Sequence, residues 1–340
     1  QFANEIDWLA RKTILKQFIK TRRKAFFVEL VEDVFENYPI IEHWLNHFKD
    51  EYYNKNYRQN PKWDRVCITT LFTFHWKATI ETIDFAKDLV KDVSQLFVGG
   101  VLATILHEEV FNETGIKTHK GLLDKEGILD NNKIVIDELP LDYSILYEID
   151  YKYPENNGYY GYMTRGCKRK CEFCAVWRLE PSFKNYIPLK KAVEQVVETY
   201  GEKRNLLLLD NNVLASNQFE TIIEEIKSLG FKKETKFIEP NYYEIAIKNL
   251  KSGYNDFGFS KQIFSLLKQL LSKSKNGDKQ NVFNILTENK LLHFETITKG
   301  NILKSYKSLA PIYEKYIKKA PKLRYIHFNQ GVDARFMTEK

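Results

Sequence analysis

Three cysteines lie within eight residues of one another, in the stretch GYMTRGCKRKCEFCAVWRLEP. The spacing of Cys167, Cys171 and Cys174 is C-x3-C-x2-C, and such short spacers let one loop bring three sulfur atoms to one inorganic centre. Thiolates are typical ligands of iron–sulfur clusters and of zinc. A closed structural zinc site and an ordinary cubane cluster both use four protein ligands, so a set of three leaves one metal position open for another molecule.

Two other interpretations of the cysteines are less favoured. A disulfide with one leftover thiol does not suit a chain that has four cysteines in 340 residues and no secretory signature. A zinc site completed by a distant residue such as His293 or His327 is disfavoured because the usual second C-x2-C or H-x3-H half is absent. The remaining cysteine, Cys67, lies in an apolar run, and we expect it to pack in a core rather than to act as a fourth ligand.

The cysteine spacing, Phe173 before the third cysteine and the Gly-Tyr-x-Thr-Arg-Gly lead-in resemble the cluster loop of the radical S-adenosylmethionine (SAM) enzymes. The resemblance implies that Cys167, Cys171 and Cys174 hold a 4Fe-4S cluster, that SAM chelates the open iron, and that Phe173 lies beside the SAM adenine. It also implies reductive cleavage of SAM to a 5'-deoxyadenosyl radical, which abstracts hydrogen from a substrate, with a flavodoxin or a ferredoxin as the one-electron reductant. The substrate and the reaction type stay open, because fold alone does not choose them.

The composition is that of a globular protein long enough for two domains, with 43% hydrophobic and 14% aromatic residues. No apolar run approaches the roughly 20 residues of a membrane span, and no signal-peptide pattern is present, so we expect no membrane contact and a cytoplasmic location. The net charge of +7 permits an anionic partner without requiring one. Because the chain stops in what resembles the start of an element, we expect a fragment of a longer protein.

In the N-terminal part, the pattern of apolar residues predicts helices followed by an α/β unit. Residues 1–60 have apolar residues at helical spacing, and the basic run at 20–24 is either a solvated helix face or a nucleic-acid contact. Runs of β-forming residues at 66–72 and 96–98, with a helical pattern at 78–91 between them, predict a parallel β-α-β unit.

The stretch GGVLATILHEEVF resembles a segment of the cobalamin-binding-like domain that precedes many radical SAM barrels. The cobalamin signature Asp-x-His-x-x-Gly is absent, so we interpret residues 61–135 as a degenerate Rossmann-like domain that is not expected to bind cobalamin. Residues 136–158, which contain two prolines, are interpreted as a linker.

The cysteine loop precedes a second α/β pattern. A helix over 189–200, a buried strand over 205–210 and a helix over 217–229 that Gly230 ends are predicted from the apolar pattern. The run resembles part of the radical SAM (β/α) barrel, so residues 159–340 are interpreted as a truncated, partial barrel.

Three polar residues follow the buried strand of this pattern. Asp210, Asn211 and Asn212 lie at the predicted carboxyl end of a parallel strand, where barrel active sites are built, and the resemblance implies that they line the cofactor site. A plain turn made of good turn-forming residues is the alternative.

The next predicted strand comes only at 324–328, and its continuation resembles the third barrel strand and the turn after it. The resemblance implies that Gln330, Asp333 and Arg335 reach SAM or substrate. The lysine-rich, helical residues 231–320 are interpreted as an insertion, whose basic and aromatic side chains make nucleic acid a candidate partner, with a plain helical cap as the alternative. A second hypothesis is a nucleic-acid-binding protein with structural zinc or an Fe-S cluster and no radical chemistry.

Overall fold

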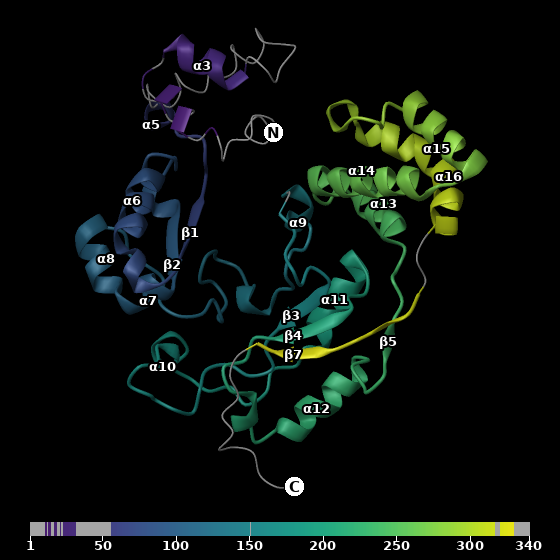
Figure 1. Ribbon diagram of the computed structural model, residues 1–340. Coiled ribbons are helices and arrows are strands. Elements are labelled where there is room, and N and C mark those ends of the chain that lie inside the picture. Colours follow the sequence, from purple (N-terminus) through teal and green to yellow (C-terminus); the bar gives the residue numbers. More distant parts are fainter. Residues whose placement is uncertain are drawn as a thin grey trace. The chain divides into compact units, whose positions relative to one another are not determined.

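The computed structural model describes an α/β protein whose sheets are mainly parallel. The described residues are isolated positions between 11 and 23 and the ranges 24–31, 56–149, 151–316 and 320–329. They belong to two compact units, Gln1–Gly121 and Leu122–Lys340 (Figure 1). The division falls inside the range 61–135 that we predicted as one domain. Among the described residues, no helix is both long and apolar enough to cross a bilayer.

The first unit contains the predicted parallel β-α-β unit. Its described elements are α3 (Lys24–Val31), α5 (Asn56–Gln59), β1 (Val66–Thr70), η1 (Thr73–His75), α6 (Trp76–Lys87), η2 (Val93–Gln95), β2 (Leu96–Gly100), α7 (Val101–Ile105) and α8 (His107–Thr114). β1 and β2 pair in parallel with Val66 opposite Leu96, and α6 connects them, which confirms the prediction. Most of residues 1–60, including Lys20 and Arg22 of the basic run, lies outside the described residues, and the described elements there, α3 and α5, are helices.

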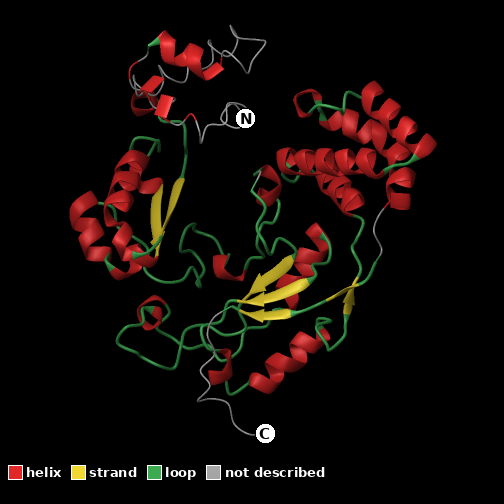
Figure 2. Cartoon of the chain, viewed as in Figure 1, coloured by secondary structure: helices red, strands yellow, loops and turns green. Residues whose placement is uncertain are grey.

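One face of β1 is packed and the other is exposed. Val66 and Ile68 pack against the core of this unit, which includes Ile83 of α6 and Leu102 of α7. Successive side chains of a strand point to opposite faces, and α6, α7 and α8 lie on one side of the two strands (Figure 2). Cys67 is therefore exposed, and our expectation that it packs in a core is wrong.

The second unit is built on a parallel sheet with the strand order β3-β4-β7 (Figure 1). Its described elements are η3 (Ile136–Glu138), α9 (Ile145–Glu148), β3 (Gly158–Gly161), α10 (Val176–Leu179), α11 (Lys190–Tyr200), β4 (Asn205–Leu208), η4 (Val213–Ala215), α12 (Phe219–Ser228), β5 (Lys236–Phe237), α13 (Tyr242–Ser252), α14 (Asp256–Lys273), α15 (Asn276–Glu288), η5 (Phe294–Thr296), α16 (Lys299–Tyr316), β6 (Lys322–Leu323) and β7 (Ile326–Phe328). The helices predicted at 189–200 and 217–229 and the strands predicted at 205–210 and 324–328 are all present.

The central strand β4 is buried along its whole length, which explains its uniformly apolar run of leucines. Leu206 pairs with Tyr159 of β3 on one side and with Ile326 of β7 on the other. The helices that follow β3 and β4 are tied together, because one carboxylate oxygen of Glu225 on α12 accepts the N–H groups of Leu189 and Lys190 at the start of α11, each at 2.9 Å. This contact satisfies two donors that a helix start leaves without intrahelical partners.

Gly230 ends α12 as predicted. Its φ of +87° is in the left-handed region, where glycine carries no Cβ penalty. The N–H of Gly230 donates to the Lys227 carbonyl at 3.1 Å, and the N–H of Phe231 donates to the Ile226 carbonyl at 3.2 Å. These two bonds form a Schellman motif, which stops the helix and turns the chain.

The predicted insertion consists of the helices α13 to α16 and is joined to the sheet through a short ribbon. The chain leaves through β5 and returns through β6, which pair antiparallel, and β6 directly precedes β7. The insertion therefore joins the sheet at the amino end of β7. The cysteine loop leaves from the carboxyl end of β3, and because the strands are parallel, the two features lie at opposite ends of the sheet (Figure 1).

Candidate functional site

The three closely spaced cysteines lie on the loop between β3 and α10. Their thiols are free and half-buried. The carbonyl of Cys171 accepts the N–H of Cys174 at 3.0 Å and the indole Nε1–H of Trp177 at 3.2 Å, and the N–H of Arg169 donates to Cys167 Sγ at 3.5 Å. These contacts give the loop a turn between the second and third cysteines, and they leave the sulfur atoms of Cys171 and Cys174 available.

The described residues contain no group of three or more His, Cys, Asp or Glu side chains arranged to hold a metal ion. His293 lies between α15 and α16, and His327 lies on β7, so neither completes such a group. The donor set itself fits an iron–sulfur cluster, because three free thiols share one loop and thiolates are the ligands that these clusters use. Metal binding by the three cysteines stays a prediction.

Phe173 lies on the same loop and is 94% exposed. An aromatic side chain with so much free surface can stack against a planar ligand, since rings attract one another face to face with an offset. The predicted position of this ring beside the adenine of SAM stays a prediction.

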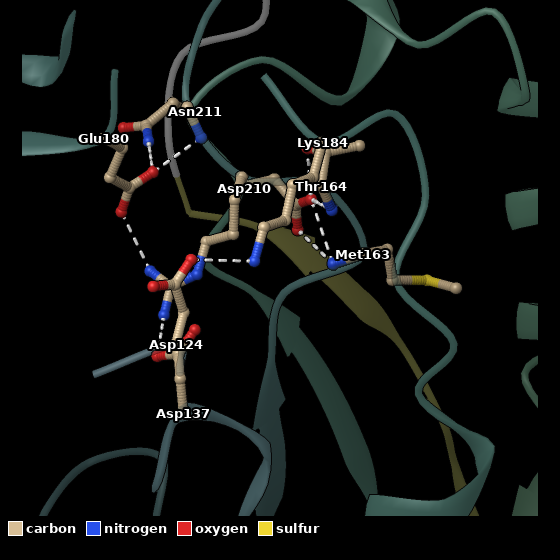
Figure 3. Close-up of polar contacts among 10 residues, drawn as sticks. Asp124, Asp137, Met163, Thr164, Glu180, Lys184, Asp210 and Asn211 are labelled. Atoms are coloured by element: carbon tan, nitrogen blue, oxygen red, sulfur yellow. Dashed lines mark hydrogen bonds and ion pairs between the residues drawn. The ribbon is translucent and has the colours of Figure 1, made fainter. Parts of the chain in front are cut away.

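Asp210, at the carboxyl end of β4, holds the lead-in to the cysteine loop. Its buried carboxylate accepts the N–H of Met163 at 3.0 Å, the hydroxyl of Thr164 at 2.6 Å and the N–H of Thr164 (Figure 3). Burial raises the pKa of Asp210, while the hydrogen bonds from Thr164 and Met163 act in the opposite direction. Because its carboxylate is engaged by the chain itself, the structure gives Asp210 a positioning role.

A buried ion-pair network also lies at the base of the cysteine loop. The guanidinium of Arg165 donates from Nη1 to Glu180 Oε1 at 2.9 Å and from Nη2 to Asp137 Oδ1 (Figure 3). It also lies 3.5 Å from the centroid of the Tyr162 ring. The Arg165 side chain is 8% exposed, and those of Glu180 and Asp137 are 11% and 22% exposed. Because these charged side chains are largely shielded from water, removing one of them would leave the others buried without a partner, and that would destabilise the fold.

The carboxylate of Glu180 joins the entry of the loop to its exit. Its Oε2 accepts the N–H of Gly166 at 2.6 Å and the side-chain Nδ2–H of Asn211 at 3.0 Å (Figure 3). The backbones also pair, since Arg165 and Lys184 exchange hydrogen bonds at 3.3 and 2.9 Å. The residues between them, which include all three cysteines, are thus held as a closed loop at the carboxyl end of the sheet.

Gly166 occupies a position that only glycine fits, and its replacement is a testable prediction. Its φ is +73°, and a Cβ would lie 2.7 Å from the Ser182 carbonyl oxygen and 2.9 Å from that of Glu180. We expect Gly166→Ala to lower the free energy of unfolding by about 2 kcal/mol, through left-handed strain and the backbone clash together. Urea unfolding followed by circular dichroism measures the loss.

Gly127 supplies the matched control for this substitution. Its φ is +74°, but the nearest atom to an added Cβ is the Asp130 carbonyl oxygen at 3.7 Å, so Gly127→Ala adds the strain without the clash. We expect a loss of about 1 kcal/mol there. Equal losses at the two positions would show that the packing around Gly166 does not constrain the loop.

The last residue of the predicted polar group has an unused hydrogen-bonding atom. Asn212 is 4% exposed, and its Oδ1 has no hydrogen-bond partner among the described residues. Most buried polar side-chain atoms are hydrogen-bonded, so an orphaned amide oxygen is available to a donor from a bound molecule. Of the three residues predicted to line a cofactor site, Asp210 and Asn211 hold the loop, and Asn212 keeps a free acceptor.

Three other predicted residues, Gln330, Asp333 and Arg335, lie outside the described residues. Conversely, sequence reasoning missed Glu180 and Asp137 as residues of the site. The lead-in contained a signal for them, which was Arg165. An arginine that becomes buried needs carboxylate partners. No known family model matches the chain, and no curated protein matches it in sequence.

Proposed function

We propose that the chain is a radical SAM enzyme in which Cys167, Cys171 and Cys174 bind a 4Fe-4S cluster and SAM occupies the open iron. One observation carries the proposal: three free thiols share a single loop, and buried charged residues tie both ends of that loop at the carboxyl end of parallel strands. Active sites of parallel α/β proteins are built at this end of the strands. The proposal includes a partial (β/α) barrel formed by the second unit and a Rossmann-like origin for the first.

When bound, the cluster and SAM supply one-electron cleavage of the sulfonium and a 5'-deoxyadenosyl radical that abstracts hydrogen from the substrate. The residues of this chain would position the cluster and SAM and shield them from water. Asp210 and the Arg165–Glu180 pair hold the loop in place. Phe173 offers an exposed ring for stacking, and Asn212 offers a buried acceptor to a donor of the cofactor. A flavodoxin or ferredoxin is the proposed reductant, the cytoplasm is the proposed location, and cobalamin is not part of the proposal.

The test is anaerobic reconstitution with iron and sulfide, followed by electron paramagnetic resonance of the reduced protein with and without SAM. We expect about four iron atoms per chain and a 4Fe-4S signal that shifts when SAM is added. Cys171→Ala should abolish the signal. Cys67→Ala is the matched control, because that thiol is exposed in the first unit and should leave the signal unchanged.

The opposite result is equally informative. A protein that takes up stoichiometric zinc and forms no cluster would contradict the radical proposal. Zinc would favour the second hypothesis, a nucleic-acid-binding protein with a structural metal, since a closed zinc site performs no redox chemistry.

A further inference from the structure

We propose that the helices α13 and α16 of the insertion form a docking surface for the phosphate backbone of a nucleic acid. The surface is centred on three exposed lysines, Lys251, Lys304 and Lys307, and is called the lysine surface below. It goes beyond the proposed radical chemistry, because it lies on elements that carry none of the cysteine-loop residues.

Positive charge is concentrated in the insertion. Residues 231–320 contain 17 lysines and no arginine against eight acidic residues, whereas the net charge of the whole chain is +7. The insertion therefore carries a larger positive excess than the complete chain, and the remainder is slightly negative. An excess gathered on one module creates a local field that attracts a polyanion, which a uniform distribution of the same net charge would not.

The helix α16 separates an apolar side from a basic one. Ile302, Leu309 and Ile312 are buried in the core of the second unit. Most of the exposed positions recur after three or four residues, so they share one face of the helix. These positions are Gly300, Lys304, Lys307, Ser308, Pro311, Glu314 and Lys315. The face thus presents three ammonium groups and one carboxylate, and the carboxylate lies at the end of the helix beside Lys315.

Two of these lysines have no ion-pair partner among the residues that the structure describes. Lys315 lies 3.4 Å from Asp278, but no ion pair joins Lys304 or Lys307 to another described residue. The only acidic residue of α16, Glu314, is seven residues beyond Lys307, which is about two turns of helix.

The lysine surface extends onto α13. The Nζ of Lys251 lies 5.1 Å from the centroid of the Tyr306 ring, and Tyr306 directly precedes Lys307. This contact places the two helices side by side with Lys251 at their junction. The only acidic residue of α13, Glu244, is seven residues before Lys251, so it lies about two turns away.

The side-chain chemistry favours phosphates over other anions. A lysine ammonium is a compact point charge that contacts phosphates whatever the base sequence, whereas carboxylates are better matched by the planar fork of arginine, which the insertion lacks. A helix that lies on a lipid surface needs large apolar side chains at the contact, and the exposed face of α16 at Lys304, Lys307, Ser308, Pro311 and Lys315 has none. A nucleic acid is the polyanion that fits this surface.

The location makes the two proposals separable. The insertion joins the amino end of the sheet, and the cysteine loop lies at the carboxyl end. Nucleic-acid binding at the lysine surface therefore needs no cluster. A variant in which Cys167, Cys171 and Cys174 are all replaced by alanine should bind nucleic acid with the same affinity as the unchanged chain.

The experiment measures binding of the full chain to a fluorescein-labelled, mixed-sequence single-stranded DNA of about 30 nucleotides by fluorescence anisotropy, over a salt series. We compare the unchanged chain with a variant that combines Lys251→Gln, Lys304→Gln and Lys307→Gln. At low salt we expect the affinity to fall about tenfold or more. The slope of log affinity against log salt is negative, and it should become shallower by about two, since each lost phosphate contact on a single strand removes about 0.7 from its magnitude.

The matched control combines Lys77→Gln, Lys117→Gln and Lys191→Gln, three exposed lysines outside the insertion. It removes the same charge and should retain most of the affinity. An equal loss in both variants would overturn the proposal, because net charge alone would then explain binding. Absence of salt-dependent DNA binding by the unchanged chain would also overturn it. Binding to phosphatidylserine vesicles but not to DNA would assign the surface to lipid headgroups instead.

Discussion

Replacing Arg165 with methionine should destabilise the second unit by about 3 to 5 kcal/mol, the cost of leaving buried carboxylates without their cation. The substitution keeps a long apolar side chain over Tyr162 but removes the contacts to Glu180 and Asp137. Glu180 would then be less able to hold the entry and exit of the cysteine loop together. Chemical unfolding followed by circular dichroism measures the global loss, and the rate of tryptic cleavage within the loop measures the local one.

Trypsin is a suitable probe because Lys168, Arg169 and Lys170 lie between the first two cysteines. We expect faster cleavage there in Arg165→Met. Lys184→Met is the control, because it breaks the ion pair between Lys184 and Asp124. The two side chains are 43% and 28% exposed, so the free energy of unfolding should fall by less than about 1 kcal/mol. Similar losses in the two variants would mean that the Arg165 network contributes no more than a surface pair.

Replacing Asp210 with asparagine should lower the free energy of unfolding by about 3 kcal/mol, since two or three charge-assisted hydrogen bonds are lost or weakened. Asparagine has nearly the same shape, but its amide group adds donors where the N–H groups of Met163 and Thr164 already donate. The lead-in to the cysteine loop should therefore become mobile. The same unfolding and proteolysis measurements report the effect.

Asp256→Asn is the control for this second substitution. Asp256 pairs with Lys299 at 3.0 Å, but its side chain is 50% exposed, so its loss should cost less than about 1 kcal/mol. If Asp210→Asn were as stable and as resistant to trypsin as the control, Asp210 would not position the loop. A contact with a bound cofactor would then be the better explanation of its place at the end of β4.

The sequence predicted α11, β4, α12 and β7 of the second unit, because their patterns are local, but it did not predict β3. The leucines of β4 are continuous because both faces of a central parallel strand are covered. Gly230 marks the end of α12 because a left-handed residue is needed there. The long gap between Gly230 and the strand at 324–328 also predicted correctly that helices separate α12 from β7.

The first unit shows where local patterns stop being sufficient. The run around Cys67 predicted a strand correctly, but neither face of that strand carries a charged residue, so the two faces look alike in the sequence. Which face is covered depends on where α6, α7 and α8 pack, and that information is not in a five-residue run. We therefore predicted that Cys67 packs in the core, whereas its neighbours Val66 and Ile68 pack there.

The sequence by itself determined the donor chemistry and the order of the elements, because thiol spacing and hydrophobic periodicity are properties of short stretches of backbone. Only the tertiary structure decided that Asp210 faces the loop lead-in, that Asn211 binds Glu180, and that Asp137 pairs with Arg165. These partners are between 28 and 46 residues apart in the chain. Pairs at such separations form when packed elements bring them together and exclude water, and no spacing rule within a single element encodes them.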